Sequence, residues 1–387
     1  MRTPLVYMDY AATTPADSRV IESMNTCCGI DGTFANPASM HELGRRAASV
    51  VNNARRQLGC LLNTDPDRLI WTSGATESDN LAIRGAALAR AKRGRHLVTM
   101  RTEHKAVIDT FNSLKNEGFD VTWLSPGKDG LLSLDDLAGV IRDDTQLVSI
   151  MHVNNETGVI QDICGIGELC RENDVLFHCD AAQSVGKLEI NLQEMPIDLL
   201  SLTAHKFYGP QGIGALYIAD RPRCGIFPIT FGGGHEKRLR PGTLPVHQIA
   251  GLGFAAEIAN AELKDNMRHV TTMQDRLWLG ILGIPGLLRN GDANSSYAGI
   301  LNVSVSGVEG ESLILGMEPV CVASGSACNS TNAEPSYVLR ALGRSDLEAQ
   351  AAVRFSFGRL TTTADVDLAI NRYCSTVERL RSIAPVT

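Results

Sequence analysis

Short apolar runs that stop abruptly at polar residues recur through the first half of the chain. They cover residues 69–72, 97–100, 147–153, 175–179 and 215–218, and helical patterns separate several of them. This order of strand, helix and strand predicts an α/β fold with a mostly parallel, buried sheet flanked by helices. Ligands of open α/β sheets bind at the carboxyl ends of the strands, so we expect the polar residues after these runs to share one site.

Two of the predicted strand ends carry a carboxylate and an amine. Asp180 follows the run 175–179, and Lys206 closes the segment that begins at Ser201. Burial lowers the pKa of a lysine and frees its amine as a nucleophile. Pyridoxal phosphate needs such a lysine for its aldehyde and an acidic partner for its ring nitrogen. The pair therefore predicts a pyridoxal-phosphate site, against the alternative of a solvated lysine and a helix-capping aspartate.

The loop 73–76 lies between the predicted strand 69–72 and a helix predicted from Glu77. Small residues before a helix leave backbone N–H groups free at its positive end, which favours a bound phosphate. The segment has neither the Gly-Lys-Ser/Thr of a Walker loop nor three spaced glycines, so the phosphate of a non-nucleotide cofactor fits better. The alternative is that Thr76 only caps the helix.

Further polar residues stand where strands or loops meet helices. His104 follows the run 97–100, where an imidazole could stack on a flat cofactor or move protons, or simply cap a helix. Asn155 follows the run 147–153. Asn36 lies in a loop that could hold a substrate carboxylate, although a plain turn explains it equally well. Residues 232–243 are typical of a mobile basic loop that closes over an active site, including that of a neighbouring subunit.

A long helical pattern from Gly251 to about Leu282 leads into a smaller α+β region. We predict a large cofactor domain at 15–260 and a small domain at 1–14 and 261–387, with a loop at about 321–334. Cys328 in this loop has only small or polar neighbours, as a thiolate that must reach a substrate would need, although most cysteines are structural. Arg354 in a predicted strand could bind a substrate carboxylate, with a surface ion pair as the alternative.

Composition narrows the range of functions. The chain has 387 residues, 44% of them hydrophobic and 20% charged, which is typical of a protein with a substantial core. The sequence contains no run of eighteen apolar residues and no signal-peptide pattern. We therefore expect a cytoplasmic protein rather than a membrane or secreted one. The net charge of −7 argues against direct nucleic-acid binding. The ten cysteines form no Cys-x-x-Cys pair, so we expect no metal site.

Four motifs together resemble the NifS/IscS-type cysteine desulfurases, a class V aminotransferase group of fold-type I pyridoxal-phosphate enzymes. The likeness is closest to the IscS subgroup and runs from Asp9 to Arg359. The motifs are Thr72-Ser73-Gly74-Ala75-Thr76-Glu77-Ser78-Asp79-Asn80, Thr102-Glu103-His104-Lys105, His152-Val153-Asn154-Asn155-Glu156 and Ser324-Gly325-Ser326-Ala327-Cys328. The resemblance implies a homodimer that takes sulfur from L-cysteine, releases L-alanine and passes the sulfur from a persulfide to an acceptor protein.

The resemblance also implies roles for individual residues. Lys206 would be the Schiff-base lysine, Cys328 the sulfur acceptor, and His104 the residue that stacks on the cofactor and moves protons. The other implied cofactor ligands are Ala75, Thr76, Asn155, Asp180, Gln183, Thr203, His205 and, from the second subunit, Thr243. Asn36, Asn155 and Arg354 would hold the substrate carboxylate.

The sequence departs from the family pattern at a few small residues and at its end. Thr203, Cys179 and Asn329 replace the commoner serine, aliphatic residue and threonine. The end at Thr387 lacks the extended tail with which IscS proteins hold their iron–sulfur scaffold. Iron–sulfur cluster assembly and tRNA or DNA thiolation are therefore both open as the pathway. Two alternatives are an aminotransferase or lyase acting on another amino acid, and a non-catalytic docking platform.

Overall fold

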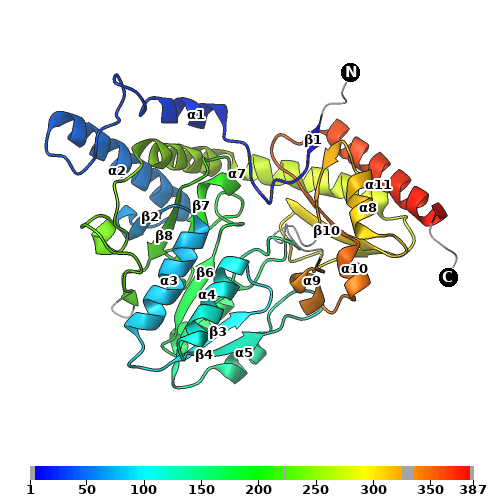
Figure 1. The fold of residues 1–387 in the computed structure, drawn as a ribbon, viewed down its shortest axis with the longest axis horizontal. Coiled ribbons are helices and arrows are strands. Elements are labelled where there is room, and N and C mark those ends of the chain that lie inside the picture. Colours follow the sequence, from blue (N-terminus) through cyan, green and yellow to red (C-terminus); the bar gives the residue numbers. More distant parts are fainter. Residues whose placement is uncertain (1–4, 222–223, 325–333, 384–387) are drawn as a thin grey trace.

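A seven-stranded sheet organises the larger part of the molecule (Figure 1). The computed structural model describes residues 5–221, 224–324 and 334–383. The order of the strands across the sheet is β2 (Leu69–Thr72), β8 (Gly214–Ile218), β7 (Leu199–Thr203), β6 (Leu176–Asp180), β5 (Thr145–Ser149), β3 (His96–Met100) and β4 (Asp120–Leu124). The pairs from β7 to β4 are parallel, and only β8 runs against its neighbours. The prediction of a mostly parallel α/β sheet is confirmed.

Helices surround this sheet and pack on it or on one another through apolar stripes. α3 (Ala75–Ala89) packs across β5, β6, β7 and β8, and α4 packs on α3. α2 and α1 lie along the long helix α7 (Val246–Ile281). The remaining helices of this part are α1 (Ser18–Asn25), α2 (Glu42–Leu62), α4 (Lys105–Asn116), α5 (Leu134–Val140) and α6 (Ile163–Glu172), with short 3-10 turns η1 (Pro66–Arg68), η2 (Ala204–Lys206) and η4 (Glu236–Arg238).

A four-stranded antiparallel sheet forms the centre of the second part. Its order is β12 (Ala323–Ser324), β13 (Ala352–Ser356), β10 (Ile300–Val305) and β9 (Leu287–Arg289). β1 (Val6–Tyr7) pairs with β11 (Val320–Cys321), so the N-terminal segment belongs to this part. The helices here are α8 (Gly310–Gly316), α9 (Tyr337–Ala341), α10 (Asp346–Gln350) and α11 (Thr363–Ile383).

Two separate hydrophobic cores support the proposed division into domains. Trp71 and Phe177 lie in the larger core, and Phe355 lies in the smaller one. α7 contributes to both, since Ala259 packs into the larger core and Val270 into the smaller. We keep the boundary at 260/261 as a proposal, which this change of core along one helix supports.

Two local predictions placed the end of an element incorrectly. The strand predicted over 147–153 is β5, which ends at Ser149. Ile150 and His152 still donate to the carbonyl oxygens of His178 and Asp180 of β6, but on the other side the N–H of Met151 donates to Oε1 of Glu103. The helix predicted from Glu77 begins at Ala75, with Gly74 as its N-cap, so Thr76 lies within the first turn and is not the cap. Gly74 has φ +155°, a backbone conformation that residues with a side chain rarely adopt.

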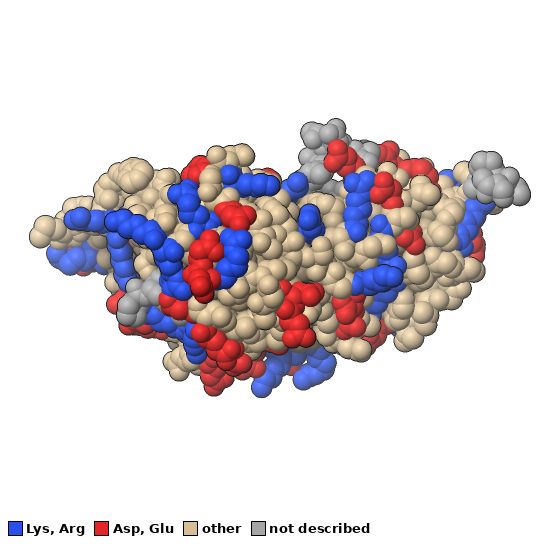
Figure 2. Space-filling model, turned by 90° about the horizontal axis from the view of Figure 1, so that it is seen from below, with Lys and Arg blue, Asp and Glu red and all other residues tan. Residues whose placement is uncertain are grey.

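Helix length and the charge of one face bear on membrane and nucleic-acid partners. Within the described ranges, no helix has both the length and the apolar character needed to cross a membrane. On the face in Figure 2, basic and acidic side chains are intermixed. Intermixed charge on that face does not make the continuous basic track that follows a phosphate backbone.

Candidate active site

A cavity of about 560 Å³ opens where the carboxyl end of the large sheet meets β13. Strand ends, the N-terminus of α3 and the N-terminal segment of the chain all contribute to its wall. It brings together most of the residues predicted from the sequence: Ala75, Thr76, His104, Asn155, Asp180, Gln183, Thr203, His205, Lys206 and Arg354. These residues come from distant parts of the sequence, so their convergence comes from the fold.

Two described residues among those predicted are not part of this wall. Asn36 and Thr243 are exposed and do not line the cavity of the single chain. Asn36 uses its Oδ1 to accept the N–H of Ala38, which is the plain turn that the sequence left open. Cys328 lies outside the described residues. The role of Thr243 requires a second subunit, so the single chain leaves it a prediction.

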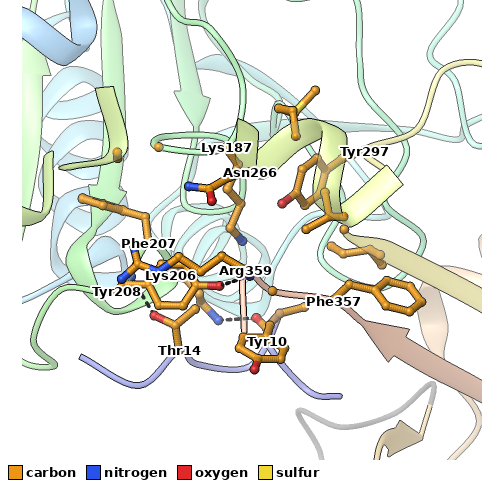
Figure 3. A pocket seen from close by; sticks show the side chains of 18 of the residues that line it. Tyr10, Thr14, Lys187, Lys206, Phe207, Tyr208, Asn266, Tyr297, Phe357 and Arg359 are labelled. Carbon is orange, nitrogen blue, oxygen red and sulfur yellow. Dashed lines mark hydrogen bonds between the residues drawn. The ribbon is translucent and has the colours of Figure 1, made fainter. Parts of the chain in front are cut away.

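Lys206 lies on η2, directly after β7, and points toward the N-terminal segment. Its Nζ donates hydrogen bonds of 2.6 Å to the carbonyl oxygens of Ala11 and Ala12. Figure 3 shows the lysine at a smaller cavity of about 30 Å³ that adjoins the site and is also lined by Tyr10 and Tyr208. Sequence reasoning missed Ala11 and Ala12 as site residues.

Asp180 ends β6 and is 5% exposed. Its Oδ1 accepts the N–H of Ala182 across 2.9 Å, which orients the carboxylate. Burial raises the pKa of Asp180, while the electrostatic interaction with His104, the hydrogen bond from Ala182 and the nearby Lys206 oppose that rise. A buried carboxylate gains most from a buried cation, so the protonated ring nitrogen of pyridoxal phosphate fits here.

His104 both caps a helix and faces the cavity. Its Nδ1 accepts the N–H of Ala106 at the start of α4, so the neutral imidazole carries its proton on Nε2. Burial is the main cause that lowers its pKa, with Lys206 acting in the same direction and Asp180 opposing. His104 therefore caps α4, as the sequence allowed, and also lines the cavity.

The N-terminus of α3 forms the anion-binding end of the cavity. The N-cap Gly74 offers no side chain to the first N–H groups of this helix. Thr203 and His205 line the same region, and Nδ1 of His205 lies 3.0 Å from Oγ1 of Thr13. Burial lowers the pKa of His205 to about 4, with Lys206 and Lys187 adding to the effect. A phosphate would satisfy N–H groups that the helix leaves free.

Arg354 reaches the opposite end of the cavity from β13. Its Nη1 donates to the carbonyl oxygen of Asn155 across 2.8 Å, and its Nη2 pairs with Oδ1 of Asp9 at 2.7 Å. The residue is 3% exposed, so a surface ion pair is ruled out. Among the described residues its buried Nε has no partner, and this free donor fits a substrate carboxylate.

The segment 232–243 is anchored on the large domain. The carboxylate of Glu236 accepts the N–H of Trp71 across 2.7 Å and pairs with Arg55 at the same distance. Arg240 pairs with Glu77, which lines the cavity. Sequence reasoning, which predicted a mobile loop here, missed these ion pairs.

A family model and two full-length relatives decide the classification. The model described as "Aminotransferase class-V" matches residues 6–368. The "Cysteine desulfurase IscS" of Shewanella sediminis is 52% identical over the whole chain and 96% of its own length. That of Colwellia psychrerythraea is 51% identical with the same coverage. The chain belongs to the class V aminotransferases. Within them it is of the NifS/IscS type, as its motifs predicted, and pyridoxal 5′-phosphate is the cofactor of these enzymes.

Solved structures agree with this classification. A chain described as "NIFS-LIKE PROTEIN" is 32% identical with a TM-score of 0.90, and the match covers 97% of this chain and 100% of that one. "SspA in complex with cysteine" is 37% identical with a TM-score of 0.82, covering 92% and 100%. The structure of DndA from Streptomyces lividans is 37% identical with a TM-score of 0.77, covering 92% and 99%.

The donor set of the cavity suits an organic cofactor. Of the described residues, no three or more His, Cys, Asp and Glu side chains are grouped so that they could hold a metal ion. An amine, a buried carboxylate, a neutral imidazole and a free helix N-terminus are instead the groups that pyridoxal phosphate requires.

Proposed function

We propose that the protein is a cysteine desulfurase that uses pyridoxal phosphate to convert L-cysteine into L-alanine and a persulfide on Cys328. The observation that carries the proposal is the cavity itself. It places the amine of Lys206, the carboxylate of Asp180 and the guanidinium of Arg354 around one space, with His104 beside them. When bound, the cofactor supplies an electron sink for the charge that forms at the substrate α-carbon.

The large domain would hold the cofactor. Lys206 would attach it, Asp180 would keep its ring nitrogen protonated, and Gln183 would donate to its phenolic oxygen from Nε2. The phosphate would lie on the N–H groups at the start of α3. The side chains and backbone proposed for this end are Ala75, Thr76, Thr203, His205 and, from a second subunit, Thr243.

The substrate carboxylate would lie between the two domains. Arg354 offers its free Nε, and its other nitrogens are already fixed by Asn155 and Asp9. Asn155 lines the cavity beside it, and we propose that its side-chain amide adds a second donor. Asn36 completes the proposed set, and its exposed position implies that it would have to approach from outside the cavity of one chain.

Lys206 and His104 are the proposed proton carriers. The amine of Lys206 would take the α-proton of the substrate. His104 exchanges a proton at Nε2, because Nδ1 is occupied by the N–H of Ala106. Proton transfers of this kind contribute about 10²- to 10⁴-fold each.

Cys328 would complete the reaction as a thiolate. Its sulfur bonds to the sulfur of the substrate while the substrate C–S bond breaks, and protonation of the carbon side gives L-alanine. A thiol and L-cysteine thus become a persulfide and L-alanine, with no external oxidant or reductant. An acceptor protein then takes the sulfur for iron–sulfur cluster assembly or for thiolation of tRNA or DNA.

We also propose a cytoplasmic homodimer. Large apolar side chains are exposed near the segments from which a partner would reach the site, among them Ile30, Phe34, Met40 and Phe231. A second subunit on this side would bury them and would bring in Thr243. The cysteines among the described residues are all free thiols, which suits a reducing compartment.

Turnover of L-cysteine with a reductant tests the function directly. Alanine and sulfide should appear in equal amounts with the wild-type protein and be lost with Cys328→Ser, which should keep its bound cofactor. Bound cofactor without alanine from L-cysteine would point to an aminotransferase or lyase. A protein that binds no cofactor at all would point to a docking platform.

A further inference from the structure

Glu156 is a buried acid for which the proposed reaction has no use. The residue is 6% exposed, and its Oε2 accepts a hydrogen bond of 2.5 Å from the hydroxyl of Ser336, which is 2% exposed. A buried carboxylate is costly unless it is well paired. The bond to Ser336 therefore serves as a strong joint between two segments that lie 180 positions apart.

The joint begins on a rigid turn of the active site. Oδ1 of Asn154 accepts the N–H groups of Glu156 and Thr157 and the hydroxyl of Thr157. The carbonyl oxygen of Glu156 accepts from Nδ2 of Asn302, and that of the neighbouring Asn155 accepts from Arg354. Any group bonded to the Glu156 carboxylate is therefore held at a fixed position relative to the proposed carboxylate site.

The other end of the joint is the start of α9. Ser336 is the N-cap of this helix, and its Oγ accepts the N–H of Leu339. The next residue, Tyr337, donates from its hydroxyl to the carbonyl oxygen of Glu103 across 2.7 Å. Two consecutive side chains thus dock the beginning of α9 on Glu156 and Glu103, the chain neighbours of the cavity-lining Asn155 and His104.

The chain between Ser324 and Glu334 contains Cys328. On its upstream side, β12 pairs with β13 so that Ala323 lies opposite Arg354 and Ser324 opposite Val353. On its downstream side, Ser336 is bound to Glu156. Both flanks of the cysteine-bearing segment are therefore tied to residues at the substrate end of the cavity.

We propose that Glu156 is a positioning residue for sulfur transfer, because its bond to Ser336 fixes the downstream flank of the Cys328 segment against the substrate site. The inference rests on the proposed function, in which Cys328 takes the sulfur. In this inference Glu156 supports only the last chemical step, the transfer of sulfur to Cys328. It has no part in holding the cofactor or in moving the α-proton.

Glu156→Met tests this division, since methionine fills a similar volume without an acceptor. Persulfide formation on Cys328, followed by mass in single turnovers of the holoenzyme with L-cysteine, should slow about 10- to 100-fold. The absorbance of the bound cofactor should be unchanged. Exchange of the α-proton of L-alanine with deuterated water, which needs no thiol, should stay within about threefold of the wild type.

A pair of serine variants separates the joint from simple helix capping. Ser336→Ala removes both the cap of α9 and the bond to Glu156, whereas Ser345→Ala removes the cap of α10 and a bond to Glu348 within that helix but leaves Glu156 and Ser336 untouched. We expect slow persulfide formation in the first variant and the wild-type rate in the second. If Glu156→Met fails to fold, these two serine variants still test the role of the bond between Glu156 and Ser336.

Two results would overturn the inference. One is an equal loss of proton exchange and persulfide formation, which would make Glu156 part of the general framework. The other is an unchanged rate of persulfide formation in Glu156→Met and Ser336→Ala. Absence of persulfide in the wild-type protein would instead contradict the proposed function. A failure of this inference is therefore distinguishable from a failure of the proposed function.

Discussion

Nζ of Lys187 donates a hydrogen bond of 2.7 Å to Oε1 of Gln183. The other end of the same amide, Nε2, donates to the carbonyl oxygen of Ala11 across 2.8 Å. A flipped amide would set its oxygen against that carbonyl and its NH₂ group against the amine, so only one orientation is stable. The lysine therefore decides which atom Gln183 presents to the cofactor.

Lys187→Met should weaken cofactor binding while leaving Lys206 in place. Figure 3 shows Lys187 pointing into the small cavity that Lys206 also lines. Burial is the main cause that holds the pKa of Lys187 well below its usual value, and the nearby Lys206 and Arg354 lower it further. Loss of the Lys187 amine as a donor should weaken the affinity of the apoprotein for pyridoxal phosphate about 10-fold, as measured by absorbance titration. Lys264→Met, at an exposed position on α7, is the matched control, and equal affinities in the two variants would contradict the prediction.

His104→Asn should separate chemistry from local structure. Asparagine can still cap α4, because its side chain can accept the N–H that Nδ1 of His104 now accepts. The variant should keep its cofactor and its stability but lose about 10²- to 10⁴-fold in kcat. Because burial lowers the pKa of His104, the wild-type enzyme should stay active to a pH below the usual histidine range. A wild-type kcat in this variant would show that the imidazole takes no part in the reaction.

Local patterns in the sequence revealed the strand ends and their chemistry. The apolar runs before Asp180 and Lys206 identified both residues, because a buried strand must end where polar groups appear. The bonds from Lys206 to Ala11 and from Arg354 to Asp9 could not be predicted, since they join residues 195 and 345 positions apart. Such contacts depend on how the N-terminal segment crosses between the two parts of the molecule.

The roles of Glu156 and Lys187 were missed for a different reason. Glu156 was noted only as the last residue of a motif and Lys187 was not noted, because both resemble ordinary surface charges. Their reduced exposure and their well-placed hydrogen-bond partners, Ser336 and Gln183, separate them from solvated residues. Local sequence patterns do not report burial of an isolated charge.

Arg354→Lys should raise KM for L-cysteine about 10- to 100-fold, with a smaller effect on kcat. Lysine keeps the charge but cannot donate at the same time to Asn155, Asp9 and a carboxylate in the fixed geometry of a guanidinium. Steady-state kinetics with varied L-cysteine measure both constants. Arg276→Lys is the control, because that arginine makes an exposed ion pair with Asp367. A KM unchanged in both variants would place the carboxylate elsewhere.

Glu156→Gln should flatten the pH dependence of stability. Burial raises the pKa of Glu156 from 4.5 to about 7, although its hydrogen bond from Ser336 and the charge of Arg354 both oppose the rise. Between these two values the folded protein holds a proton that the unfolded chain has released. The stabilising contribution is therefore complete below the unfolded pKa and is lost as the pH rises through about 7.

The size of this effect follows from the shift. The difference in unfolding free energy between wild type and Glu156→Gln should change by about 3 kcal/mol between about pH 4.5 and pH 8, in the sense that the wild type loses stability. Urea unfolding of both holoproteins across this range gives the difference and cancels the groups that they share. Parallel curves for the two proteins would mean that Glu156 titrates at the usual pKa of a glutamate, and its carboxylate would then be charged in the folded protein throughout the neutral range.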